Sequence, residues 1–188
     1  MSVASVEAPA GRDVWLRAGQ QLLRQGGVTA VKIKALQEQT GLTTGSFYHH
    51  FASMSEYLDN LADYWGLDTP GHIAEAEHPD PRTRLVEFLA IAPREDLRRL
   101  DRAMRDWAGS DRRAADAVKR VDEALLTFCA EVFTDLGYDE IDARICAQAV
   151  IATGVARVTP PWPAVENHID RLLDILMRKM PGRLPPGG

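Results

Sequence analysis

Apolar residues recur at spacings of three and four positions along most of the chain, which is the period of an amphipathic α-helix. Glycines and prolines interrupt this pattern at intervals and mark the expected ends of the helices. Asp80 and Pro81 are expected to cap and begin one helix, and Gly137 is expected to end another. Helices are predicted to begin near residues 12, 32, 43, 53, 81, 97, 111, 139 and 162. No stretch alternates apolar and polar residues at the period of two that is typical of strands. The pattern therefore predicts an all-α protein with about nine helices.

Residues 32–51 are expected to form two short helices joined by a turn at Gly41. Glycine readily takes the left-handed conformation that ends many helices, so the chain can reverse at this position. A hydroxyl of Thr43 or Thr44 can then accept a hydrogen bond from a free amide at the start of the second helix. Leu42 is expected to pack beneath the turn, and helical spacing directs Ile33, Leu36, Phe47 and Phe51 toward the same small core. This arrangement is a helix-turn-helix.

Short polar side chains cover the face of the second helix that points away from this core. A helix start with small side chains can approach a phosphate or a base edge closely, and its dipole favours negative charge. Two lysines, Lys32 and Lys34, stand at the start of the first helix of the pair. Either they contact a phosphate or they are solvated surface charges. The expected DNA contacts are Lys32, Lys34, Thr43, Thr44, Gly45, Ser46, Tyr48 and His49.

From residue 45 to residue 51 the chain has the order GSFYHHF: a small residue, a variable one, an apolar one, Tyr, two His and Phe. This order resembles the end of the N-terminal DNA-binding domain of the tetracycline repressor (TetR) family. The first helix resembles that domain too, with Gly27 closing it and apolar positions at Trp15, Leu16, Ala18, Gly19, Leu22 and Leu23. The resemblance covers about residues 12–66 and implies a DNA-binding transcriptional regulator with a three-helix N-terminal domain.

Three positions depart from the family pattern. Lys32 stands where Ser or Thr commonly caps the second helix, and Gln37 stands where Ala is common. Met54 occupies the start of the fourth helix, where the family often has a lysine that contacts a phosphate. Lys32 and Lys34 can replace part of that missing charge.

The resemblance also implies a homodimeric repressor that binds a palindromic operator. It further implies that a small-molecule effector releases this repressor from DNA. The last two helices suit a dimer interface, because residues 139–158 are rich in small side chains and residues 162–180 carry a broad apolar stripe. The alternative is that both helices only close the core of the monomer. The residues assigned to the interface are Ala149, Ala152, Ala156, Ile169, Leu172, Leu173 and Leu176.

The effector is expected to bind among bulky side chains of the middle region, although the same side chains can equally fill a dry core. These candidate pocket residues are Trp65, Phe88, Met104, Trp107 and Phe128. The expected organisation has four parts: a flexible arm over 1–11, the helix-turn-helix domain over 12–52, an effector-binding and dimerisation domain over 53–180, and a disordered tail over 181–188.

Composition and charge qualify this picture. With 45% hydrophobic and 26% charged residues, and no apolar run near the roughly 20 residues of a membrane span, we expect a cytoplasmic protein without a membrane partner. The N-terminus also lacks the basic and apolar stretches of a secretory signal. The chain carries a net charge of −5, whereas residues 12–58 hold five basic and three acidic groups, or +2. Such a weakly basic domain is expected to depend on a second copy for tight DNA binding.

Enzymatic activity is not expected. The five histidines form no pair at helical metal-site spacing with a matching carboxylate motif, and the chain has no phosphate-binding loop and no nucleophile elbow. Cys129 and Cys146 lie in apolar helical patterns, so we expect buried thiols rather than a disulfide or a metal site. No cofactor and no metal are predicted. The alternative function is a helical small-molecule-binding or scaffold protein without DNA-binding activity, which Met54 and the low basicity favour.

Overall fold

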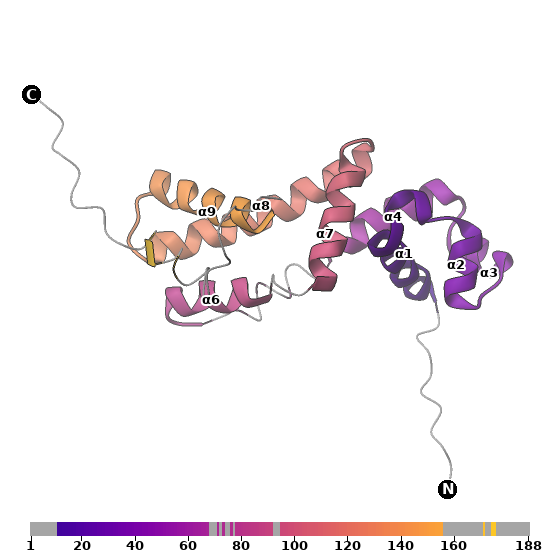
Figure 1. Ribbon diagram of the computed structural model, residues 1–188, viewed down its shortest axis with the longest axis horizontal. Coiled ribbons are helices and arrows are strands. Elements are labelled where there is room, and N and C mark those ends of the chain that lie inside the picture. Colours follow the sequence, from indigo (N-terminus) through magenta and orange to yellow (C-terminus); the bar gives the residue numbers. More distant parts are fainter. Residues whose placement is uncertain are drawn as a thin grey trace, which may run out of the picture. The chain divides into compact units, whose positions relative to one another are not determined.

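The computed structural model describes residues 11–67, 71, 73, 76, 78–91, 95–155, 171, 174 and 175. These residues form eight α-helices, one 3-10 helix and no strand, which confirms the all-α prediction (Figure 1). The helices are α1 (Arg12–Gly26), η1 (Val28–Ala30), α2 (Ile33–Thr40), α3 (Thr44–His50), α4 (Met54–Trp65), α6 (Pro81–Ile91), α7 (Glu95–Ala108), α8 (Arg112–Asp135) and α9 (Glu140–Val155). The chain forms two compact units: the first unit is Met1–His72 with Pro93–Ala124, and the second unit is Ile73–Ala92 with Leu125–Gly188.

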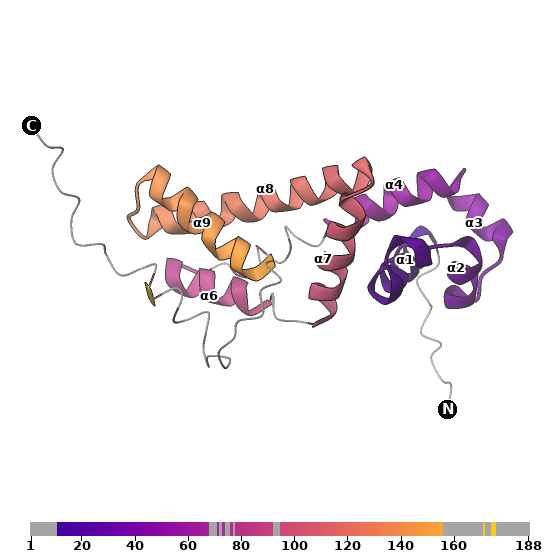
Figure 2. The same cartoon turned by 45° about the horizontal axis from the view of Figure 1, so that its top comes forward.

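In the first unit α1 packs against α2, α4 and α7 (Figure 2). Aromatic side chains form part of the core between these helices. The ring centroids of Trp15, Phe51 and Tyr57 each lie 5.3 Å from the centroid of Phe47. All four side chains are at most 1% exposed. Because rings of this size bury much apolar area, the four-residue cluster fixes the relative positions of α1, α3 and α4.

Gly19 allows α1 and α4 to approach each other closely. A Cβ atom at this position would lie 2.1 Å from the hydroxyl oxygen of Tyr57 and 2.9 Å from Cδ1 of Leu61. The Tyr57 hydroxyl uses this space to donate a hydrogen bond of 2.8 Å to the carbonyl oxygen of Trp15. Burial raises the pKa of Tyr57, so its hydroxyl keeps the proton at neutral pH. A glycine inside a helix costs stability, and the close approach of α4 explains its presence here.

Arg113, near the start of α8, connects this helix to the first turn of α4. Its Nη1 donates hydrogen bonds to the carbonyl oxygen of Ser55 at 3.0 Å and to Oγ of Ser55 at 3.3 Å. The same nitrogen lies 3.3 Å from the carboxylate of Asp59. Further along the two helices Arg120 pairs with Asp63. These contacts hold α4, which directly follows α3 in sequence, against the first half of α8.

We expect Arg113→Ala to lower the free energy of unfolding by about 1–2 kcal/mol, because its charged hydrogen bonds to α4 are lost. Arg112→Ala is the matched control, since the Arg112 side chain is 93% exposed and makes an ion pair of 3.5 Å with Asp116 on its own helix. That substitution should change the free energy by no more than about 0.5 kcal/mol. Urea denaturation followed by circular dichroism measures both values, and equal effects of the two substitutions would contradict the role given to Arg113.

Two helix ends of the middle region confirm what the sequence predicts. Oδ2 of Asp80 accepts hydrogen bonds from the backbone amide of Thr83 at 2.8 Å and from its hydroxyl at 2.6 Å, and Pro81 is the first residue of α6. The same hydrogen bonds lower the pKa of Asp80. After α8, Gly137 has a φ of 91°, a conformation that favours glycine and ends the helix.

The second unit packs α6, the second half of α8 and α9 around its own core. The ring centroids of Phe88 and Phe128 lie 4.8 Å apart in this core. Both cysteines are free; Cys129 is buried, as predicted, whereas Cys146 is only half-buried. Burial raises the pKa of Cys129 to about 12, which keeps this thiol protonated at neutral pH. Of the expected helix over 162–180, three residues are described and helical: Arg171, Asp174 and Ile175.

Each described helix is too short or too polar to cross a membrane.

Candidate nucleic-acid interface

The turn between α2 and α3 has the geometry expected of a helix-turn-helix. Gly41 has a φ of 71° and donates a backbone hydrogen bond of 2.8 Å to Gln37, which closes α2. A left-handed φ is strained for most other residues, so glycine is required here by backbone conformation. Oγ1 of Thr43 accepts a hydrogen bond of 3.2 Å from the amide of Ser46. Of the two threonines proposed as the cap, Thr43 therefore has this role, and Thr44 is the first residue of α3.

One packing prediction at the turn is wrong. Leu42 is 36% exposed, although it was expected to pack beneath the turn. The space around Phe47 is instead filled by aromatic rings, including that of Trp15, which comes from α1. Leu36 and Phe51 are buried as predicted, and Ile33 is partly buried against the same core. The helical period correctly identified the buried face of α2 and α3 but not the contribution of α1 to the core.

The outer face of α3 and its cap is open to solvent. The residues that form it are called the recognition surface below: Thr43, Thr44, Gly45, Ser46, Tyr48 and His49. Five of them are exposed and Ser46 is half-buried. Tyr48 is 50% exposed, with its ring edge-on to buried Phe47 at a centroid distance of 5.4 Å. The structure therefore brings together the α3 residues predicted to contact DNA.

Gly45 is unusual on this surface, because the fold does not require it to be glycine. An added Cβ would meet only Oγ1 of Thr43 within 4 Å, at an ordinary contact distance of 3.8 Å. Its φ lies outside the left-handed region, since only Gly11, Gly27, Gly41 and Gly137 have positive φ among the described glycines. A side chain would therefore fit at this position within the isolated protein, so neither backbone conformation nor packing requires glycine here.

Lys32 and Lys34 lie at the start of α2 and are both exposed. Lys32 is the N-cap residue, in extended conformation and without a side-chain cap hydrogen bond. The Lys34 ammonium lies 3.9 Å from a carboxylate oxygen of Glu38, and the Lys34 side chain is 88% exposed. So exposed a pair contributes little energy, and both lysines remain available to an anion.

Sequence reasoning missed Arg12, which reaches the junction between α3 and α4. Its guanidinium carbon lies 5.1 Å from the centroid of the Phe51 ring, and Nη2 lies 3.7 Å from a carboxylate oxygen of Glu56. The other carboxylate oxygen of Glu56 accepts a hydrogen bond of 2.7 Å from the amide of Ala52. The Arg12 guanidinium therefore places a positive charge at the α3–α4 junction. Met54 lies at the same junction, in the position where the resembled family often has a lysine.

The five candidate pocket residues lie in two separate cores. Met104 and Trp107 are buried in the core of the first unit, and Trp65 is partly buried against it. Phe88 and Phe128 are buried together in the core of the second unit. Trp107 also lines a shallow groove of about 310 Å³ in the first unit, beside Arg24 and Arg102.

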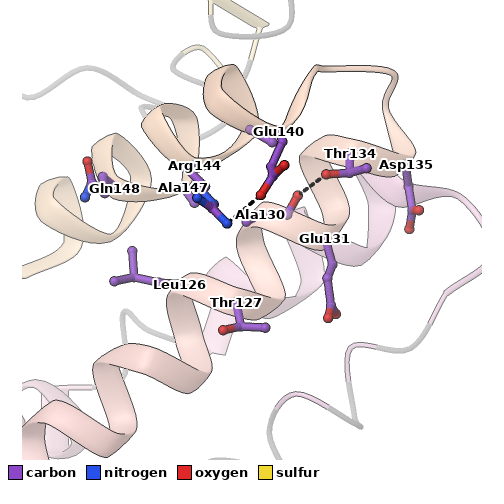
Figure 3. A pocket seen from close by; sticks show the side chains of 11 residues that line it. Leu126, Thr127, Ala130, Glu131, Thr134, Asp135, Glu140, Arg144, Ala147 and Gln148 are labelled. Atoms are coloured by element: carbon purple, nitrogen blue, oxygen red, sulfur yellow. Dashed lines mark hydrogen bonds and ion pairs between the residues drawn. The ribbon is translucent and has the colours of Figure 1, made fainter.

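The second unit has a groove of about 500 Å³ between α8 and α9 (Figure 3). None of the five candidate pocket residues lines it. Leu126, Ala130 and Ala147 contribute apolar surface, and the Arg144 guanidinium pairs with Glu140 on α9 at 2.6 Å. The remaining lining residues are Thr127, Glu131, Thr134, Asp135, Ala143 and Gln148. The groove combines apolar side chains with charged and amide groups that can orient a small molecule.

Of the predicted interface residues, Ala149 is half-buried and Ala152 is exposed on α9. The other five, Ala156, Ile169, Leu172, Leu173 and Leu176, lie outside the described residues. Sequence reasoning missed Ile141 and Ile145, which are 65% and 57% exposed on the same helix. Half-buried Ala149 continues their spacing of four residues, so one face of α9 carries an apolar stripe whose two isoleucines are exposed.

Within the described part of the chain, no three His, Cys, Asp or Glu side chains are grouped so that they could hold a metal ion.

Residues 16–60 match the model of a protein family described as bacterial regulatory proteins, tetR family. The matched segment contains most of α1, all of α2 and α3, and the first half of α4. Comparison with curated proteins finds no match to the chain.

Solved structures with a similar fold include the following three. A transcriptional regulator from Rhodococcus sp. Rha1 has a TM-score of 0.71 and 17% sequence identity, over 88% of this chain and 93% of that chain. A TetR-family transcriptional regulator from Agrobacterium tumefaciens has a TM-score of 0.64 and 19% identity, over 76% and 82% of the two chains. GusR from Salmonella enterica has a TM-score of 0.61 and 19% identity, over 77% and 79%. At these identities the likeness is one of fold.

Proposed function

We propose that this chain belongs to the tetR family of bacterial regulatory proteins and binds a specific DNA sequence through its recognition surface. The match of residues 16–60 and the similar fold support this proposal. The observation that carries the proposal is the outer face of α3. Phe47 holds the helix in the core, whereas Thr44, Tyr48 and His49 are exposed beside a glycine that the fold does not require. Such a face can enter the major groove, where hydroxyl and imidazole groups reach base edges and phosphates.

The proposal includes a homodimer and a palindromic operator. One short recognition helix contacts only a few base pairs, so two copies related by a two-fold axis are needed for a specific site. The apolar stripe of α9 supports pairing between copies, because its exposed Ile141 and Ile145 would be buried against a second copy. The net charge of only +2 over residues 12–58 also favours avidity over tight binding by a single domain.

We further propose that the protein acts as a repressor and that a small molecule releases it from the operator. The groove between α8 and α9 supports this part, since its volume of about 500 Å³ suits a small molecule. A ligand can release DNA only if it binds the release-competent state more tightly than the DNA-bound state. The test is whether a small molecule that binds the purified protein weakens its binding to the operator.

DNA binding itself is tested by selecting duplexes from a random pool with the purified full chain at low salt. Recovery of a palindromic sequence is the expected result. Failure to retard any duplex would contradict the proposal and would favour the alternative, a helical scaffold or small-molecule-binding protein without DNA-binding activity.

On the selected duplex, Thr44→Ala and Tyr48→Phe are each expected to weaken binding by about 1–3 kcal/mol, because each removes a hydroxyl from the recognition surface. The matched control is Thr127→Ala, which removes an exposed hydroxyl from α8 in the second unit and should leave affinity unchanged. Fluorescence anisotropy of labelled duplex measures all three. If neither Thr44→Ala nor Tyr48→Phe changed the affinity, the assignment of the recognition surface would be wrong.

A further inference from the structure

We propose that Arg12 contacts a phosphate of the DNA backbone at the end of α3, a role that depends on the DNA binding proposed above. Arg12 is the first residue of α1, more than thirty positions before α3 in sequence, yet its guanidinium lies over the ring of Phe51. Phe51 is the C-cap residue of α3, so the cation stands directly at the end of the recognition helix.

The position of this cation is fixed from two sides. The Phe51 ring lies beneath the guanidinium at 5.1 Å, and Glu56 lies beside it at 3.7 Å. Glu56 is itself held by the hydrogen bond of 2.7 Å that it accepts from the Ala52 amide. A guanidinium placed in this way loses little conformational freedom on binding, and its planar fork of donors matches two oxygens of a phosphate.

The Arg12 guanidinium is also available to a new partner. The Arg12 and Glu56 side chains are 47% and 42% exposed, and their closest atoms are 3.7 Å apart, beyond the range of a short charged hydrogen bond. An ion pair of this kind contributes little, so a phosphate can compete with or join it. Ala52 and Ser53, which connect α3 to α4, are exposed, so the backbone around this cation is open to solvent.

Phosphates flank the bases that a recognition helix contacts, and cations at the ends of such a helix fix its position on the duplex. Met54 provides no charge at the α3–α4 junction. Arg12 provides one there, from a different helix. The chemistry assigned to Arg12 is therefore contact with a backbone phosphodiester, independent of base sequence.

The salt dependence of DNA binding tests this assignment. For the full-chain protein and its selected duplex, each lost phosphate contact should reduce the slope of log K against log salt by about 0.9. We expect Arg12→Ala to produce that reduction for each protomer bound, with about eight-fold weaker binding per contact near 0.1 M salt. The preferred duplex sequence should not change, because phosphates carry no base identity.

Arg17→Ala is the matched control. Arg17 is on the same helix, is 57% exposed and pairs with a carboxylate, Asp13, at 3.8 Å. Five residues along a helix turn the side chain by about 140°, so Arg17 faces away from the α3–α4 junction. Its substitution should leave the slope unchanged, and a reduction equal to that of Arg12→Ala would overturn the assignment.

Glu56→Gln separates contact with DNA from a purely structural role. Glutamine can still accept the hydrogen bond from Ala52, but it removes the negative charge beside Arg12. If Arg12 contacts phosphate, this variant binds DNA more tightly, while Arg12→Ala loses slope. If Arg12 serves only to hold Glu56 and Phe51, both variants change the thermal midpoint and keep the wild-type slope, and the inference is wrong. Failure of the wild-type protein to bind any duplex would instead refute the proposed function itself.

Discussion

Gly19→Ala is expected to lower the free energy of unfolding by about 2–3 kcal/mol, because its methyl group would occupy space that α4 already fills. The added Cβ would lie 2.1 Å from the Tyr57 hydroxyl and 2.9 Å from Leu61, so at least one side chain has to move. Both are fully buried among the rings that hold α1 against α4, so little free space exists for such a movement. The thermal midpoint should fall by roughly 4–12 °C for a chain of this length.

A second substitution identifies the atoms responsible. Tyr57→Phe removes the hydroxyl that collides with the new methyl group, although alone it should cost about 1 kcal/mol because the hydrogen bond to Trp15 is lost. The double variant should therefore be more stable than the sum of the two single effects predicts, by at least about 0.5 kcal/mol. Leu61 remains close, so the rescue is partial. Strictly additive effects in urea denaturation would contradict the contact between Gly19 and Tyr57.

The ends of several helices could be predicted from the sequence because they depend on neighbouring residues. Gly41 ends α2 through its own backbone conformation, and Thr43 caps a helix that begins at the next residue. The Asp80 cap of α6 follows the same logic, since its partner Thr83 is three positions away. Such features need no knowledge of which helices pack together, and the structure confirms all three.

Contacts between distant residues could not be predicted, because helical periodicity identifies a buried face but not the partner that covers it. Leu42 illustrates this point, since an apolar residue after the turn remained 36% exposed while α1 supplied Trp15 to the core. Arg113 contacts Ser55 across 58 positions, and no local pattern marks either residue. The same holds for Arg12 and Phe51. Gly19 did carry a signal, because a glycine within a helical pattern needs a reason, but that reason was only visible in the structure.

Gly45→Ala is expected to have opposite effects on stability and on DNA binding. Within the protein the new methyl group meets only Thr43 at 3.8 Å, and alanine favours the helix over glycine by up to about 1 kcal/mol. The variant should therefore be as stable as the wild type or slightly more stable. It also serves as the control for Gly19→Ala, because the same chemical change is made in the same unit but at an open position.

DNA binding of Gly45→Ala should nevertheless weaken by about 1.4–2.8 kcal/mol, which is ten- to one-hundred-fold in affinity. The physical reason is that α3 begins at Thr44, so Gly45 lies in the turn whose free amides face an approaching phosphate or base edge. A methyl group there would keep the duplex away from these amides, and from Thr44 and Tyr48 as well. Gly109→Ala is the matched control, because Gly109 is exposed on the turn after α7 and tolerates a Cβ at 3.4 Å from its nearest neighbour. Anisotropy titrations of both variants on the selected duplex decide the matter: unchanged affinity for Gly45→Ala would mean that DNA does not approach the start of α3.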